Sequence, residues 1–181
     1  METKKGIPAI DKTIVLVGLM GAGKTCIGRR IAGKLKLPFF DSDREIEEAA
    51  GCSISDIFER YGETAFRDCE RKVIARIMSS SVSILASGGG AFMNEQTRDV
   101  IAQNGVSLWL RADLDLLVSR TAGRTHRPIL MRGNGREILA DLIEKRYPVY
   151  ASADIIVDSL DTTPDVTVKA VMHALQDYFR H

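Results

Sequence analysis

The segment Gly18–Thr25 has the residue types and the spacing of a phosphate-binding loop. It reads G-x-x-x-x-G-K-T, so a lysine and a threonine stand at its end. Glycines let the backbone curl until consecutive N–H groups point at phosphate oxygens, and a following helix adds the positive end of its dipole. Lys24 is then placed to bridge the β- and γ-phosphates of a nucleotide, and the Thr25 hydroxyl to ligate Mg²⁺. The alternative is a glycine-rich turn without a ligand.

Two aspartates, Asp41 and Asp43, are the acids best placed for a second metal contact. Many phosphate-loop proteins hold Mg²⁺ with an aspartate at the end of a central strand, but here the apolar run 82–87 leads only into Gly88–Gly90. Asp41 and Asp43 stand two residues apart at another strand end, so one side chain can face the metal while the other faces a second substrate. Either residue could instead cap a helix, but capping does not require both.

An arginine-rich segment follows later in the chain. Residues 120–136 contain five arginines, one histidine and no acid, interrupted by three glycines and Pro128. A solvated basic face is the alternative, but such faces usually include acids. We therefore predict a mobile lid at about 121–135 that closes over a nucleotide, excludes water and neutralises charge on a transferring phosphoryl group.

Two further arginines, Arg67 and Arg146, stand apart from this segment. A guanidinium group binds a planar carboxylate through two parallel hydrogen bonds, so two arginines that converge would hold an anionic acceptor. The sequence alone does not show that these two converge. A surface ion pair remains the alternative for each.

Five short apolar segments alternate with stretches of helical periodicity. The first, Thr13–Val17, is apolar and rich in β-branched residues, as expected for a strand covered on both faces. Strands are expected at 13–17, 38–40, 82–86, 106–110 and 154–157. Helices are expected at 24–35, from the Ser53–Asp56 capping box onward, at 63–78, 94–102, 114–120 and 136–150, and from 163 onward. This order predicts an α/β fold with three α/β/α layers and a five-stranded parallel sheet.

The segments that could do chemistry all fall where a predicted strand ends. They are the phosphate loop, Asp41–Asp43, Gly88–Gly90 and the arginine-rich segment. In parallel sheets, ligands bind at the carboxyl ends of the strands. We therefore expect one active site at that edge.

Composition limits the remaining possibilities. The length of 181 residues fits a single domain, 1–181. A net charge of +1 argues against a nucleic-acid partner, and no apolar run approaches the roughly 20 residues that span a membrane. Residues 1–12 lack the apolar region of a signal peptide. Cys26, Cys52 and Cys69 are odd in number and form no C-x-x-C motif, which favours buried, free thiols and a cytoplasmic location.

The ordered set of motifs resembles the shikimate kinase family over nearly the whole chain, from about Ile14 to Tyr178. The phosphate loop alone occurs in many families, but the ordered set is specific. The matching segments are Gly-Leu-Met-Gly-Ala-Gly-Lys-Thr at 18–25 with Ile-Gly at 27–28, Asp-Ser-Asp at 41–43, Ser-Ile-Ser-Asp-Ile-Phe at 53–58, Gly-Glu at 62–63, Phe-Arg at 66–67, Ser-Gly-Gly-Gly at 87–90, Arg-Pro at 127–128 and Lys-Arg-Tyr-Pro-Val-Tyr at 145–150.

This resemblance implies a P-loop NTPase fold of the nucleoside monophosphate kinase type. It implies a monomeric enzyme of aromatic amino-acid and chorismate biosynthesis that phosphorylates the 3-hydroxyl of shikimate with ATP and Mg²⁺. The implied catalytic residues are Lys24, Asp43 and Arg127. The implied ATP contacts are Gly21, Ala22, Gly23, Lys24, Thr25, Cys26, Arg120 and Arg127. The implied shikimate contacts are Asp43, Arg67, Gly88, Gly89, Gly90 and Arg146, and the implied Mg²⁺ ligands are Thr25 and Asp41.

Two departures and two alternatives remain. Some relatives carry an arginine near the adenine in the loop before the last helix, whereas Ser159–Thr163 has none, and the lid reads Arg-Pro-Ile-Leu where Arg-Pro-Leu-Leu is commoner. A kinase of gluconate or a nucleoside monophosphate would share the phosphate loop. A non-catalytic nucleotide-binding regulator would share it too.

Overall fold

The computed structural model describes residues 9–122 and 133–180. Most of the predicted lid, including Arg127, therefore lies outside the described residues. Among the helices that the structure describes, none is long and apolar enough to cross a membrane.

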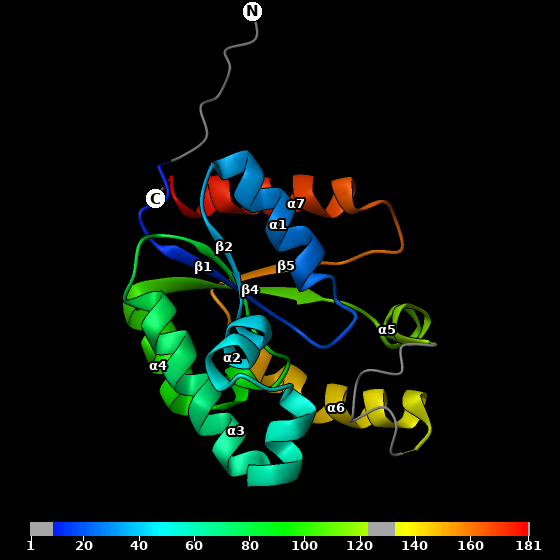
Figure 1. Ribbon diagram of the computed structural model, residues 1–181. Coiled ribbons are helices and arrows are strands. Elements are labelled where there is room, and N and C mark those ends of the chain that lie inside the picture. Colours follow the sequence, from blue (N-terminus) through cyan, green and yellow to red (C-terminus); the bar gives the residue numbers. More distant parts are fainter. Residues whose placement is uncertain (1–8, 123–132, 181) are drawn as a thin grey trace, which may run out of the picture.

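A five-stranded sheet forms the centre of the molecule (Figure 1). The strands are β1 (Thr13–Val17), β2 (Phe39–Asp41), β3 (Ile84–Ala86), β4 (Gly105–Arg111) and β5 (Ile155–Asp158). They lie in the order β2-β3-β1-β4-β5, and every neighbouring pair is parallel. All five residues of the central strand β1 are buried. The predicted parallel sheet is confirmed, although β3 begins two residues later than expected.

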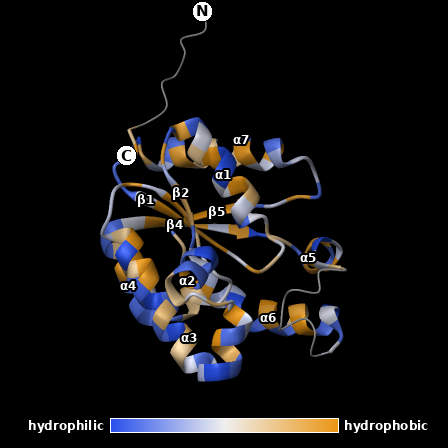
Figure 2. Ribbon diagram, viewed as in Figure 1, coloured by the Kyte–Doolittle hydropathy of each residue, from blue (hydrophilic) through white to orange (hydrophobic). Residues whose placement is uncertain are grey.

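Helices cover both faces of this sheet and complete the predicted three layers. Figure 1 shows α1 (Lys24–Leu35) and α7 (Pro164–Tyr178) on one face, with α3 (Ile54–Met78), α4 (Glu95–Asn104) and α6 (Gly135–Tyr150) on the other. The shorter helices are α2 (Ser42–Ala50), η1 (Ala91–Met93) and α5 (Leu114–Thr121). Figure 2 shows that apolar residues concentrate in the strands, where burial of apolar surface stabilises the fold.

The helix α2 was not predicted from the sequence. Five of its nine residues are charged, and Ile46 is the large apolar side chain that it buries. A helix this short, with one large apolar side chain, offers too few apolar positions to establish a helical period in the sequence. It begins where Asp41 Oδ1 accepts a hydrogen bond from the Asp43 N–H at 3.1 Å, so Asp41 caps this helix with one oxygen and keeps Oδ2 for another contact.

The helix α3 contains a break at Gly62, whose φ of 82° and ψ of 175° are not helical. The predicted pair of helices, one after Ser53 and one from about residue 63, is therefore confirmed as two helical parts. The predicted capping box is also present, because Ser53 and Asp56 bond reciprocally through side chain and backbone. The break matters because the second part carries Arg67.

The cysteines differ from the sequence prediction. All three are free thiols, but Cys26 is exposed, and Cys52 and Cys69 are only partly buried. Cys26 lies on the first turn of α1, on the side of the helix that faces solvent, whereas the next residue, Ile27, is buried.

Candidate active site

The phosphate loop leaves β1 and enters α1 directly, the context that the motif requires. Gly21 and Gly23 adopt φ values of 86° and 98°, in the left-handed region that favours glycine. The Lys24 ammonium group donates to the carbonyls of Gly18 at 2.7 Å and Leu19 at 3.0 Å. The Lys24 side chain thus folds back over the phosphate loop, where its ammonium group can contact a ligand that the loop binds.

The predicted metal ligands lie side by side. The Thr25 hydroxyl donates to Asp41 Oδ2 at 2.8 Å, although sixteen residues separate them. Neighbouring ligands of an octahedral Mg²⁺ lie roughly 3 Å apart, and Mg²⁺ prefers oxygen ligands. These two oxygens therefore fit a magnesium ion that takes its other ligands from phosphates and water.

Asp43 faces away from Asp41, toward the glycines that follow β3. A Cβ atom on Gly88 would lie 2.9 Å from Asp43 Oδ1, so no side chain fits between them. Ser42, between the two aspartates, is fully buried and accepts a hydrogen bond from the Gly88 N–H at 2.9 Å. The expected divergence of Asp41 and Asp43 is present.

Arg67 and Arg146 converge on adjacent glycines. A Cβ on Gly90 would lie 2.5–2.7 Å from the Arg67 guanidinium, and one on Gly89 would lie 3.3 Å from Arg146 Nη1. The buried Nη1 of Arg146 has no hydrogen-bond partner among the residues that the structure describes. A buried donor of this kind is costly unless a ligand satisfies it. The arrangement therefore favours an anion site over a surface ion pair for Arg146.

Glu70 is the buried carboxylate of this cluster. Its side chain is 3% exposed, and Oε2 accepts from Arg67 Nη1 at 2.8 Å. Its other oxygen, Oε1, is buried without a hydrogen-bond partner in the described part of the chain and lies 2.6 Å from the Cβ position of Gly88. Burial raises the pKa of Glu70, and the charge of Asp43 adds to this rise, while Arg67 and Arg146 oppose it.

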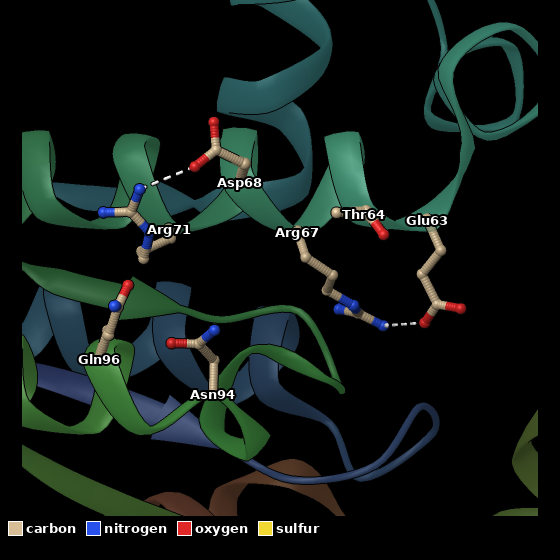
Figure 3. A pocket seen from close by; sticks show the side chains of 7 residues that line it. All are labelled: Glu63, Thr64, Arg67, Asp68, Arg71, Asn94 and Gln96. Atoms are coloured by element: carbon tan, nitrogen blue, oxygen red, sulfur yellow. Dashed lines mark hydrogen bonds and ion pairs between the residues drawn. The ribbon is translucent and has the colours of Figure 1, made fainter.

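A polar pocket of about 490 Å³ opens on the outer side of Arg67 (Figure 3). Its lining residues are Glu63, Thr64, Arg67, Asp68, Arg71, Asn94 and Gln96. In Figure 3 the guanidinium of Arg67 turns toward Glu63, with which it forms a 3.7 Å ion pair. Neither Asp43 nor Arg146 lines this pocket. Asp43, Arg67 and Arg146 therefore meet over the glycine run Gly88–Gly90 rather than inside the pocket.

Arg120 lies on the outer side of the phosphate loop. Its Nη1 donates to the carbonyls of Gly21 at 3.2 Å and Ala22 at 3.3 Å, and to the Ser159 hydroxyl at 3.0 Å. Its Nη2 donates to the Leu160 carbonyl at 2.9 Å. Arg120 therefore contacts the phosphate loop itself, and its predicted contact with ATP stays a prediction.

Comparisons with known proteins agree with this geometry. A family model described as "Shikimate kinase" matches residues 20–176. The shikimate kinase of Paramagnetospirillum magneticum is 59% identical over 169 residues, which are 93% of this chain and 87% of that protein. The chain belongs to the shikimate kinase family. A solved shikimate kinase from Acinetobacter baumannii in complex with shikimate has a TM-score of 0.87 at 36% identity, covering 92% of this chain and 94% of that one.

Membership of the shikimate kinase family confirms the resemblance inferred from the motifs. It makes the chain an ATP-dependent phosphotransferase, so the alternative of a non-catalytic regulator is excluded. A gluconokinase from Sinorhizobium meliloti 1021 has a TM-score of 0.64 at 17% identity, covering 94% of each chain. That likeness shows a shared fold alone, so it does not favour gluconate as the acceptor.

Sequence reasoning missed Glu70 in this member of the shikimate kinase family. A signal was available, because residues 66, 70, 73 and 77 share one face of α3, and a carboxylate is unexpected on a buried face. Its position three residues after Arg67 also predicts a contact between the two side chains.

We predict that Glu70 makes folding stability depend on pH. An unfolded chain ionises this carboxyl near its ordinary pKa of 4.5, whereas burial raises the pKa in the folded chain. Rising pH therefore favours the unfolded state across the interval between the two values. The melting temperature of Glu70→Gln minus that of the original chain should therefore become larger as the pH rises from 4.5 to 7.

A thermal unfolding series at several pH values measures this difference. The ion pair with Arg67 forms only when Glu70 is ionised, so it opposes the rise in the pKa of Glu70 and is already contained in the net upward direction. Glu48→Gln is the matched control, because Glu48 is well exposed and forms an i,i+4 pair with Arg44 on α2. A Glu70→Gln difference that stays constant with pH would contradict the raised pKa.

Proposed function

We propose that this chain transfers the γ-phosphate of ATP to the 3-hydroxyl of shikimate, giving shikimate 3-phosphate and ADP. The observation that carries the proposal is the convergence of Arg67 and Arg146 over Gly89–Gly90, beside Asp43. Two guanidinium groups can bind one planar carboxylate, and the neighbouring Asp43 can orient or deprotonate the hydroxyl that is phosphorylated. The phosphate loop lies at the same edge of the sheet, as the parallel topology requires.

On the donor side, backbone N–H groups of Gly21, Ala22 and Gly23 and the Lys24 ammonium would hold the phosphates. In the structure, the Lys24 ammonium donates hydrogen bonds to two carbonyls of the loop. When ATP binds, it would donate to phosphate oxygens instead. Thr25 and Asp41 would hold Mg²⁺, and their 2.8 Å contact supports this assignment. A bound Mg²⁺ would neutralise charge on the phosphate oxygens.

On the acceptor side, Arg67 and Arg146 would clamp the shikimate carboxylate while Gly88–Gly90 lines the ring. The glycines are necessary because any Cβ at Gly88 or Gly90 would collide with the groups that form the site. Asp43 would then orient the 3-hydroxyl or accept its proton. Phosphoryl transfer requires mainly positioning and charge neutralisation, which these groups supply.

The remaining assignments concern residues around this centre. Arg127, on the proposed lid, would contact the transferring phosphoryl group, and Arg120 and Cys26 would lie against the nucleotide. We also propose a single domain, 1–181, that acts as a monomer in the cytoplasm. The three free cysteines support a reducing compartment. Analytical ultracentrifugation would test the monomeric state, because a stable dimer would give a molar mass twice that of one chain.

An acceptor panel tests the proposed reaction. ADP release is coupled to NADH oxidation with MgATP and, in turn, shikimate, gluconate and nucleoside monophosphates as acceptors. We expect release that depends on shikimate, with a product that is shikimate 3-phosphate by mass and NMR. Release with gluconate or a nucleotide but not with shikimate would overturn the proposal.

We predict that Arg146→Ala mainly impairs binding of shikimate. The variant removes one charge-assisted arm of the clamp, a loss of about 1.5–3 kcal/mol, or roughly 10- to 150-fold in the KM for shikimate. The KM for ATP should change little. Arg44→Ala is the control, because Arg44 is exposed and pairs only at the surface with Glu48. An unchanged KM for shikimate would contradict the clamp.

A further inference from the structure

Ser159 is a buried hydroxyl that the motif analysis did not connect with chemistry. It follows β5 directly, and its N–H donates to the Arg111 carbonyl at 2.7 Å, so the pairing of β4 with β5 holds its backbone in place. The residue is 4% exposed. A buried hydroxyl requires hydrogen-bond partners, and those of Ser159 belong to the nucleotide side of the site.

The Ser159 hydroxyl joins the end of the sheet to the phosphate loop. Its Oγ donates to the Ala22 carbonyl at 3.0 Å, across 137 residues of sequence. The same oxygen accepts a hydrogen bond from Arg120 Nη1 at 3.0 Å. Because Arg120 Nη1 also reaches the Ala22 carbonyl, the three groups form a closed triangle of hydrogen bonds. The Leu160 carbonyl holds the other arm of Arg120.

Holding one carbonyl determines where the next N–H points. In a trans peptide, the C=O of one residue and the N–H of the following residue point in opposite directions. With the Ala22 carbonyl drawn outward to Ser159 and Arg120, the Gly23 N–H is directed to the opposite side of the loop. Gly23 has no side chain that could restrain this peptide, and its φ of 98° lies in the left-handed region that glycine adopts readily.

We propose that Ser159 is a positioning residue for the phosphate loop, acting through the Ala22 carbonyl to aim the Gly23 N–H at the phosphate of the nucleotide. Ser159 itself does not touch the nucleotide. This role rests on the proposed ATP site and adds to it a residue from the last strand. It also explains why Arg120 lies on the loop, because the arginine and the serine support the same peptide.

Ser159→Ala tests the proposal, with binding of MgADP to the full chain measured by calorimetry. Loss of one hydrogen bond to the loop is expected to weaken MgADP binding about 3- to 10-fold. The KM for ATP should rise by a similar factor, while the KM for shikimate stays unchanged. A merely structural role would instead lower the melting temperature and the active fraction without this selective change.

Ser83→Ala is the matched control. Ser83 is also a fully buried serine, but its hydroxyl has no hydrogen-bond partner among the described side chains and backbone, and it lies before β3 at the opposite end of the sheet. Its removal should leave MgADP binding unchanged. In addition, the effects of Ser159→Ala and Arg120→Ala on MgADP binding should not add, because both residues support one carbonyl.

The outcomes separate this inference from the proposed function. If the original chain binds MgADP and Ser159→Ala binds it equally well, the positioning role is wrong and the ATP site stands. Equal weakening of ATP and shikimate binding would also overturn the role. If the original chain does not bind MgADP, both proposals fail together.

Discussion

Asp43→Asn is expected to lower the kcat for shikimate phosphorylation by about 10²- to 10⁴-fold, the range that a positioned acid or base contributes. Asparagine keeps the size of the side chain but removes its charge and basicity. Asp43 Oδ1 lies against Gly88, beside the buried oxygen of Glu70, so the change is confined to the acceptor side. The cap of α2 should persist, because Asp41 forms it. Binding of MgADP should therefore change little.

Steady-state kinetics with varied shikimate at saturating MgATP measures this effect. Asp165→Asn is the control, since Asp165 forms an exposed ion pair with Arg30 on the surface of α7, and its kcat should match that of the original chain. A near-normal kcat for Asp43→Asn would exclude Asp43 both as a base and as the group that orients the hydroxyl. If Asp43 acts as a base, the acidic limb of the kcat/KM profile should also disappear in the variant.

Lys24→Ala is expected to lower kcat by about 10²- to 10³-fold, as measured for loss of one preorganised donor to a developing charge. The ammonium group lies at the mouth of the loop, bonded to the carbonyls of Gly18 and Leu19. It would therefore reach the transferring phosphoryl group with little rearrangement. Alanine removes the charge and both loop contacts together, so stability must be measured beside activity.

Two comparison variants separate these contributions. Lys34→Ala, in the last turn of the same helix, removes an exposed ammonium far from the loop and should leave kcat unchanged. Lys24→Arg keeps the charge but presents a planar fork in place of a compact ammonium, so only part of the activity should return. A Lys24→Ala variant with the original kcat and an intact melting temperature would remove Lys24 from the proposed mechanism.

Much of the fold was predictable because its signals are local. The apolar run Thr13–Val17, the capping box at Ser53 and the cap at Asp113 are formed by neighbours in sequence, and each appears in the structure. The phosphate loop is also local, since eight consecutive residues supply its glycines, lysine and threonine. The helix α2 escaped prediction because nine residues with one large apolar side chain offer too few apolar positions to reveal a helical period.

Individual residues of the active site were predictable from the sequence, but whether distant ones come together was not. Sequence spacing indicated that Asp41 and Asp43 diverge, and the contacts with Thr25 and Gly88 agree. Whether Arg67 and Arg146 converge was open, because they lie 79 positions apart on helices whose placement depends on the sheet. Glu70 was missed because a charged residue on a helix is ordinary until its burial is known.

By itself, the sequence determined the phosphate loop, the order of the five strands and the longer helices along the chain, and the family to which the chain belongs. Each of these depends on residue types at short, fixed spacing. The tertiary structure alone decided that Arg146 presents, beside Gly89, a buried nitrogen with no hydrogen-bond partner in the described part of the chain. It also decided that Ser159 supports the Ala22 carbonyl. Such contacts join residues tens of positions apart, and their distances follow from how parallel strands and covering helices pack rather than from any local pattern.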